Sequence, residues 1–485
     1  MVPSIRISAA NDMPVNARGD FVLYWMTAFR RKDWNFSLQR AVEWAEELEK
    51  PLVILEALRC DYPWASDRFH GFILDGMRDN QRHFRATPVF YFPFVEKRKG
   101  EGKGLLERLG SYACLVIADD YPAFFLPRMV RAAARALKVK LEVVDSNGLL
   151  PLRATEQVFV TAFSFRRFLQ KNLPEHLGQL PAADPLAGAS LPTLTALPEV
   201  ITARWEPAPD VMLKATPECL NALPIDHQVQ TAPLRGGPDA ARNTLRTFLR
   251  ENLHPYHMVR NHPDEDGASG LSPFLHFGHI SVHQVIADLI EREDWTPERL
   301  SVKATGKRVG WWGMDEGAEA FLDQLITWRE LGFNMCSRRD DYDHFESLPD
   351  WAQRDLLDHA GDIRPYVYSL DEFEAANTHD PLWNAAQRQL LLEGRMHNYL
   401  RMLWGKKILE WSPSPQDALA VMIELNNKYA LDGRDPNSYT GIFWVLGRYD
   451  RPWFPQRPVF GKIRYMSSAN TMRKVRVEEY LHRYS

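Results

Sequence analysis

Residues 21–58, FVLYWMTAFRRKDWNFSLQRAVEWAEELEKPLVILEAL, contain two apolar runs separated by a more polar segment. The runs at 21–26 and 51–58 are rich in β-branched and aromatic residues, which indicates two buried strands. Residues 36–49 have the amphipathic pattern of a helix. We therefore predict a β-α-β unit, because two parallel strands need a crossover connection between them.

The same alternation of apolar runs and amphipathic stretches continues to about residue 150, which is typical of a parallel sheet covered by helices. We predict an α/β domain with a doubly wound parallel sheet over residues 1–173. The further strands are expected at 88–94, 114–120 and 140–146, and the further helices near 67–86, 104–110 and 123–138.

The carboxyl ends of these strands are the expected ligand edge of the sheet, because open α/β sheets bind their ligands there. Trp25 and Met26 end the first predicted strand, and Asp119 and Asp120 end the fourth. No Gly-x-Gly-x-x-Gly follows the first strand. A dinucleotide or P-loop phosphate site in this domain therefore has no support from the sequence.

The composition changes after residue 173. Residues 174–238 hold 11 of the 33 prolines and have a weak apolar period, which predicts an interdomain connector. Trp205, Met212 and Leu213 are too apolar for a free tether, so part of the connector should be packed. Residues 239–485 are predicted to form an all-α domain. Its helical periods lie at 239–252, 281–293, 317–331, 382–411 and 414–430.

The overall composition, with 45% hydrophobic and 25% charged residues among 485, is typical of a globular protein of several domains. No run approaches the roughly 18 apolar residues of a membrane span, and the N-terminus lacks the layout of a secretory signal. We expect a cytoplasmic protein with no membrane contact. The four cysteines lie far apart, which argues against a disulfide framework or a zinc cluster, so we expect reduced thiols.

The C-terminal region is basic and aromatic. Residues 440–485 hold nine Lys or Arg against three Asp or Glu, although the whole chain has a net charge of −4. Cations interleaved with aromatic rings suit a polyanion whose bases can stack. On charge alone, a solvated surface explains the pattern equally well.

Two further motifs have both a structural and a functional interpretation. Trp404 and Trp411 are seven residues apart, so they lie about 10 Å apart along one helix face. This spacing suits an electron hop, but large aromatic residues at helical spacing, Trp383 included, more often fill a core. Ser269 and Ser272 lie near a predicted helix start, where hydroxyls and backbone amides hold a phosphate or cap the helix.

Taken together, the segments resemble the class II cyclobutane-pyrimidine-dimer photolyases of the photolyase/cryptochrome family, in the family's order and over most of the chain. The resemblance implies an α/β antenna-type domain, a long connector and an all-helical domain that binds FAD. The matching blocks are VLYWM, SNGLLPL, SGLSPFLHFGHIS, FLDQLITWREL, DPLWNAAQ, GRMHNYLRMLWGKKILEW, LNNKYALDGRDPNSYTGIFW and RPVFGKIRYM.

The resemblance also implies which residues bind the cofactor. Hydroxyls matching Tyr256, Ser269 and Ser272 lie against the FAD phosphates, where an anion held by hydroxyls is chemically reasonable. Asn426 matches the residue that hydrogen-bonds flavin N5. An arginine beside the flavin would stabilise its anionic reduced ring. The implied FAD-binding residues are Tyr256, Ser269, Gly270, Leu271, Ser272, Arg329, Asn398, Arg401, Asp432 and Arg434.

The same family match assigns an electron route and a lesion site. Trp404, Trp383 and Trp411 match the tryptophans that pass an electron to photoexcited flavin. Trp328 and Trp444 match the aromatic pair that clamps a flipped-out dimer, since extruding crosslinked bases costs little and two ring faces recover the stacking. Arg448 and Arg464 of the basic C-terminal region are expected to contact DNA.

The implied function is light-driven repair of cyclobutane pyrimidine dimers by electron transfer from reduced FAD. We expect the protein to be a monomer that associates with DNA. Gln324 departs from the family, which usually has Glu there; an amide donates a hydrogen bond but supplies no proton. This favours an alternative, a cryptochrome-like photoreceptor with little repair. A light-independent adenine-nucleotide-binding protein and repair of the 6-4 photoproduct also stay open. The sequence leaves open whether the antenna-type domain binds a pigment, and whether such a pigment is a deazaflavin, a folate or a flavin.

Overall fold

The computed structural model describes residues 1–485, and the chain divides into two compact units. Neither unit is continuous in sequence, whereas the sequence predicts continuous domains, so the predicted boundaries at residues 173 and 238 stay a prediction. Unit 1 comprises Met1–Glu156, Leu173–Arg246 and Leu271–Arg292, and unit 2 comprises Gln157–Asn172, Thr247–Gly270 and Glu293–Ser485.

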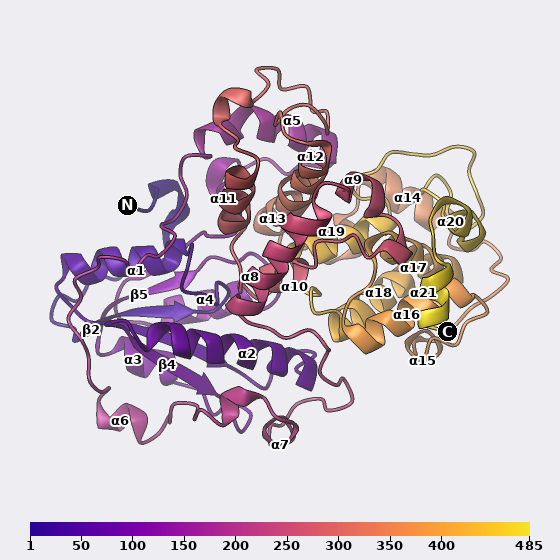
Figure 1. Ribbon diagram of the computed structural model, residues 1–485. Helices are drawn as coiled ribbons and strands as arrows, with labels where there is room; N and C mark the ends of the chain where they lie inside the picture. Colours follow the sequence, from indigo (N-terminus) through magenta and orange to yellow (C-terminus); the bar gives the residue numbers. More distant parts are fainter. The chain divides into compact units, whose positions relative to one another are not determined.

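Unit 1 is built on a six-stranded sheet with the order β1-β6-β5-β2-β3-β4. Figure 1 labels its strands β2, β4 and β5. Strands β2 to β6 pair in parallel, which confirms the predicted α/β sheet, and only β1 runs antiparallel, at the edge beside β6. The strands are β1 (Ile7–Ala9), β2 (Phe21–Met26), β3 (Leu52–Leu58), β4 (Phe90–Val95), β5 (Ala113–Asp119) and β6 (Leu141–Val144).

Helices cover both faces of this sheet, as a doubly wound fold requires. Inward-facing residues of α1 and the end of α2 share one core with alternate residues of β2 and β3. Residues of α3 and α4 share a second core with the other residues of those strands. The four helices are α1 (Phe36–Glu47), α2 (Asp67–Phe84), α3 (Leu105–Gly110) and α4 (Leu126–Ala136).

The carboxylate of Asp119, at the end of β5, lies under the turn that follows β2. One of its oxygens accepts hydrogen bonds from the backbone N–H groups of Thr27, Ala28 and Phe29 at 2.8, 2.7 and 2.9 Å. The other accepts from the Tyr24 hydroxyl at 2.8 Å. A buried carboxylate with these donors is fully paired, so it locks the turn to the sheet.

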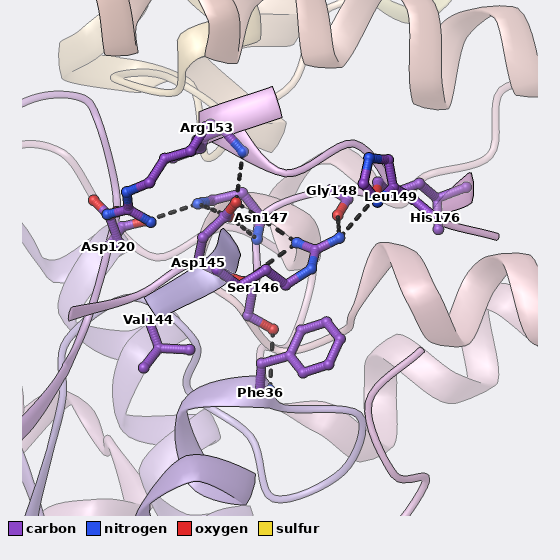
Figure 2. A network of polar contacts seen from close by, with 12 residues as sticks. Phe36, Asp120, Val144, Asp145, Ser146, Asn147, Gly148, Leu149, Arg153 and His176 are labelled. Atoms are coloured by element: carbon purple, nitrogen blue, oxygen red, sulfur yellow. Dashed lines mark hydrogen bonds and ion pairs between the residues drawn. The ribbon is translucent and has the colours of Figure 1, made fainter. Parts of the chain in front are cut away.

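A second buried network holds the segment after β6 (Figure 2). The guanidinium of Arg6 is completely buried and lies 3.6 Å from the carboxylate of Asp145. It donates to the carbonyl oxygens of Gly148 and Leu149 at 3.1 and 2.7 Å. A buried ion pair needs such additional hydrogen bonds to offset its desolvation, and here they fix the start of the chain to the SNGLLPL segment.

The proline-rich segment is packed where the sequence predicts packing. Trp205 is 3% exposed and Leu213 is fully buried, and the Trp205 indole N–H donates to the Glu101 carbonyl oxygen at 2.9 Å. The segment contains only short helices, because its prolines interrupt longer ones. They are η3 (Leu173–Glu175), α6 (Glu199–Thr202), η4 (Met212–Lys214) and α7 (Pro217–Asn221), and α8 (Pro238–Thr247), α10 (Ser272–His276) and α11 (Val282–Arg292) follow.

Unit 2 contains no strand, which confirms the all-α character of the C-terminal part. The helical period predicted over 382–411 is interrupted, because Gly394 has a φ of 66° and ends the first helix with a left-handed residue. The main helices are α5 (Ala162–Asn172), α9 (Tyr256–Val259), α12 (Glu316–Leu322), η8 (Asp323–Trp328), α13 (Arg329–Arg338), α14 (Asp350–Asp358), α15 (Leu370–Glu374), α16 (Pro381–Glu393), α17 (Asn398–Trp411), α18 (Pro415–Tyr429), α19 (Pro436–Val445), α20 (Ser468–Lys474) and α21 (Glu478–Arg483).

Candidate functional site

Three tryptophan rings form a continuous array in unit 2. The rings of Trp383 and Trp404 are stacked, with centroids 6.4 Å apart and an interplanar angle of 6°. The ring of Trp411 lies 6.0 Å from Trp383 at 66°. Trp383, on α16, therefore joins the two tryptophans that helical spacing places on α17.

Hydrogen bonds fix the orientation of this array. The Trp383 indole N–H donates to the Trp404 carbonyl oxygen at 3.0 Å, and the Trp404 indole N–H donates to Gln387 Oε1 at 2.9 Å. Asp380 caps α16 by accepting from the backbone N–H groups of Leu382 and Trp383. Because the buried indole N–H groups of Trp383 and Trp404 are paired, these rings have a defined geometry rather than a loose packing.

Two residues that the sequence analysis missed extend the array beyond Trp411. The Tyr368 ring lies 5.6 Å from the Trp411 ring, and the His379 ring lies 4.9 Å from it. The Tyr368 hydroxyl is 2.7 Å from His379 Nδ1, and His379 is exposed. No sequence spacing indicates this cluster, because its members come from two loops and a helix that only the fold brings together.

An ion pair lies at the start of α17. Arg401 Nη2 is 2.9 Å from Asp432 Oδ1, and each side chain is 16% exposed. Asn398 lies one turn before Arg401 on the same helix and is exposed. Asn398, Arg401 and Asp432 are the residues predicted to lie at the flavin edge. Among them, the carboxylate of Asp432 fixes the partly buried cation of Arg401, and the exposed amide of Asn398 lies on the same helix as Arg401.

The predicted flavin N5 residue lies deeper in the unit. Asn426 is 2% exposed, and its Nδ2 donates to the Ser438 hydroxyl at 2.7 Å. Arg434 is also buried and has a φ of 65°. Its guanidinium donates to the carbonyl oxygens of Gly433 and Asn427 at 3.2 and 3.3 Å, so it ties the turn after α18 to the end of that helix.

The predicted phosphate-binding residues lie in two parts of the chain. Tyr256, the first residue of α9, is buried, and the Arg260 guanidinium lies 5.7 Å from its ring centroid. Burial raises the pKa of the Tyr256 hydroxyl, which therefore stays a protonated donor. Ser269 and Gly270 are half-buried in unit 2, with Gly270 at a φ of 68°. Leu271 and Ser272 belong to unit 1.

The donor chemistry of these residues in unit 2 fits a flavin dinucleotide. The hydroxyls of Tyr256 and Ser269 and the cation of Arg260 are groups that bind an anionic diphosphate. Arg401 is a fixed cation of the kind that stabilises an anionic reduced ring.

The predicted lesion-clamping tryptophans lie on packed elements. Trp328 ends η8, Trp444 is the penultimate residue of α19, and both are half-buried. Helix α13 contacts both η8 and α19, which connects the two. Gln324 is half-buried within η8. The Arg329 guanidinium lies 4.3 Å from the ring centroid of Phe333 on the same helix.

The two arginines expected to contact DNA have different environments. The Arg464 guanidinium lies 3.9 Å from the Trp453 ring centroid, and its side chain is 37% exposed. Arg448 is 1% exposed; it donates to the Tyr342 carbonyl oxygen at 2.9 Å and to the Ser347 hydroxyl. Arg448 thus stabilises the fold here, and the predicted DNA contact would require it to leave these partners.

Comparison with known proteins places the chain in a family. A curated deoxyribodipyrimidine photo-lyase of Methanothermobacter thermautotrophicus is 34% identical over 486 residues, covering 100% of this chain and 98% of the relative. The chain belongs to the deoxyribodipyrimidine photo-lyase family. Photo-lyases of Arabidopsis thaliana and Potorous tridactylus are 31% and 30% identical, over 95% and 98% of this chain and 88% and 83% of the relatives. No family model matches the chain.

The photo-lyase fold is shared with a solved structure. A bacterial class III photolyase from Agrobacterium tumefaciens matches with a TM-score of 0.67 at 17% identity, over 98% of this chain and 88% of that one. No helix of the chain is both long and apolar enough to cross a membrane. No group of three or more His, Cys, Asp or Glu side chains is arranged to hold a metal ion.

A buried ion pair fixes the segment of this chain that carries Gln324 and Trp328. Arg166 Nε lies 2.7 Å from Asp323 Oδ1, and the two side chains are 9% and 7% exposed. Replacing Asp323 by Asn should lower the free energy of unfolding by about 3 kcal/mol, because it leaves a buried guanidinium without its counter-charge. Urea unfolding followed by circular dichroism measures this loss.

The matched control is Asp341→Asn, which breaks an exposed pair with Arg339. An exposed pair contributes less than about 1 kcal/mol, so this variant should unfold nearly like the wild type. Equal losses for Asp323→Asn and Asp341→Asn would contradict the special role of the buried pair.

Proposed function

We propose that this protein repairs cyclobutane pyrimidine dimers in DNA by light-driven electron transfer, as a class II type deoxyribodipyrimidine photo-lyase. The observation that carries the proposal is the contiguous Trp404–Trp383–Trp411 array, in a chain that matches curated photo-lyases over nearly its whole length. Neighbouring rings whose centroids lie 6.4 and 6.0 Å apart are close enough to pass single electrons from one to the next.

The cofactor of the proposal is FAD, which when bound and fully reduced supplies the photoexcited electron that enters the dimer. Tyr256 and Ser269 would donate hydrogen bonds to its phosphates. Arg401, oriented by Asp432, would hold a positive charge beside the ring, and Asn426 would offer an amide to N5. The family resemblance assigns these positions, and the donor chemistry described above supports them.

The lesion would bind between Trp328 and Trp444. Their rings recover the stacking that a flipped-out dimer loses, and covering the dimer excludes water from it. Gln324, on the same helical segment as Trp328, would donate a hydrogen bond to a lesion carbonyl and stabilise negative charge there. Arg464, whose side chain is 37% exposed and paired with Asp450, would contact a DNA phosphate at the rim of the site.

The tryptophan array would serve the return to the active redox state. Trp404 would give up an electron to the flavin. Trp383 would then return an electron to Trp404, and Trp411 would return one to Trp383. Tyr368 and His379 extend the array to an exposed residue, where an external reductant has access. In this proposal the protein acts as a cytoplasmic, DNA-associated monomer. Its antenna-type domain would bind an accessory pigment.

The alternative is a cryptochrome-like photoreceptor with the same fold and flavin. Gln324 is the residue that favours it, because it lacks the acidic proton of the usual Glu. The test is repair of an oligonucleotide with one thymine dimer by photoreduced protein, in blue light and in the dark, with a 6-4 lesion in parallel. We expect light-dependent loss of the cyclobutane dimer alone. A protein that carries FAD and photoreduces, but repairs neither lesion, would be the photoreceptor.

A further inference from the structure

A buried lysine closes the end of α19. Lys406, on α17, is completely buried, and its Nζ donates to the carbonyl oxygen of Val445 at 2.6 Å. Val445 is the last residue of α19. The last carbonyls of a helix have no intrahelical partner and carry the negative end of its dipole, so an ammonium there is both a hydrogen-bond donor and a favourable charge.

The same ammonium lies against the ring of Trp444. Lys406 Nζ is 5.0 Å from the Trp444 ring centroid, and the guanidinium carbon of Arg464 is 5.5 Å from it. A cation within about 6 Å of an indole centroid is attracted to the ring, most strongly where water is absent. Lys406 therefore holds Trp444 twice, through its ring and through the backbone of the next residue.

The ionised groups around Lys406 leave its charge poorly compensated. Asp450, which favours the charged amine, is engaged by Arg464 at 2.8 Å, and Arg464 itself opposes the charge. On α17, Lys407 and Glu410 pair with each other at 2.6 Å. Burial is the largest effect and lowers the pKa of Lys406 from 10.5 to about 7. The amine thus changes charge near neutral pH.

We propose that Lys406 is a positioning residue for Trp444, which in its charged form holds the indole in place to stack on a flipped-out dimer. This rests on the proposed repair function and adds to it a determinant of lesion recognition. The positive charge of Lys406 close to the ring also favours binding of an anionic polymer to Trp444. Preference for damaged DNA should therefore be greatest below about pH 7 and decline above it, as the amine loses its proton.

The test compares wild type with Lys406→Met and Lys406→Gln. Dissociation constants are measured for an oligonucleotide with one thymine dimer and for its undamaged twin, from about pH 6 to pH 9, across the titration of Lys406. At the acid end, Lys406→Met should reduce the ratio of damaged to undamaged affinity by about tenfold. The wild-type ratio should fall toward the variant's as pH rises, while the variant's ratio stays flat.

Lys407→Met is the matched control. It removes one lysine from the next position of the same helix, but Lys407 contacts Glu410 and the Trp411 ring rather than Trp444. It should leave the affinity ratio unchanged. Lys406→Gln keeps a donor for Val445 but lacks the charge, so it should lose the pH dependence even if Lys406→Met fails to fold.

A readout without DNA or flavin is the pH dependence of unfolding. The folded pKa of Lys406 lies below its unfolded value, so the unfolded chain binds the extra proton between about pH 7 and 10.5 and stability rises with pH across that window. Lys406→Met and Lys406→Gln should remove this slope, and Lys407→Met should not.

The outcomes separate the two proposals. If wild type prefers damaged DNA but neither Lys406 variant alters the ratio or its pH dependence, the inference about Lys406 is wrong and the repair function stands. If the variants weaken the binding of damaged and undamaged DNA equally, Lys406 contributes only a positive charge that attracts any DNA. The positioning role is then also wrong. If wild type itself shows no preference for the dimer, the proposed function fails and the inference fails with it.

Discussion

The double variant Trp328→Ala, Trp444→Ala should lose its preference for dimer-containing DNA by about a hundredfold or more. Each base stacked on an aromatic ring contributes about 1–3 kcal/mol, and tenfold in affinity corresponds to about 1.4 kcal/mol. Binding of undamaged DNA should change little, because the basic residues of the C-terminal region stay in place. Competition binding with a thymine-dimer oligonucleotide against undamaged DNA measures the ratio.

The control for this variant is Tyr366→Ala, which removes a 48% exposed aromatic ring of unit 2 that belongs to neither predicted clamp position. It should keep the wild-type preference. Unchanged preference in the double variant would exclude Trp328 and Trp444 as the lesion clamp, whereas equal losses for the two kinds of DNA would assign them to general DNA binding.

Replacing Trp383 by Phe should stop most of the light-driven reduction of bound oxidised FAD by an external thiol. Trp383 is the only ring of the array that contacts both Trp404 and Trp411, and phenylalanine is much harder to oxidise. Repair by enzyme reduced chemically beforehand should continue, because in the proposed function the electron passes from the flavin to the dimer without using the array. Flavin absorbance under illumination, and repair after dithionite reduction, measure the two steps separately.

Trp311→Phe is the matched control, since Trp311 is a buried tryptophan of unit 2 that packs on Trp312 and lies outside the array. It should photoreduce like wild type. Photoreduction at the wild-type rate in Trp383→Phe would show that electrons reach the flavin by another route.

The elements of unit 1 are predictable because strand and helix have different periods. Both ends of each strand from β2 to β6 lie within two residues of the predicted run, since each strand is buried and continuous in apolar character. The edge strand β1 (Ile7–Ala9) was missed because three residues show no period. The sequence also did not predict that the units are discontinuous. Residues 157–172 belong to unit 2 and residues 271–292 belong to unit 1, although most of each unit lies elsewhere in the sequence.

The candidate site is predictable by residue type but not by geometry. Helical spacing places Trp404 and Trp411 on one face, yet the ring between them comes from α16, and only packing brings Trp383 there. Its charge alone predicts that Arg448 lies at the surface, whereas the structure buries it and pairs it with the Tyr342 carbonyl oxygen. Nothing in WGKKILEW distinguishes the buried Lys406 from the ion-paired Lys407, because which lysine meets the end of α19 depends on the helix crossing.

The carboxylate of Asp119 has a consequence for any nucleotide offered to unit 1. Consecutive backbone N–H groups at a turn after a strand form the kind of hollow that binds a phosphate. Here the chain supplies its own anion to that hollow, since Thr27, Ala28 and Phe29 all donate to Asp119. A phosphate arriving there would find its donors taken and a like charge in place. A phosphate-bearing pigment therefore gains no anchor from these three backbone N–H groups.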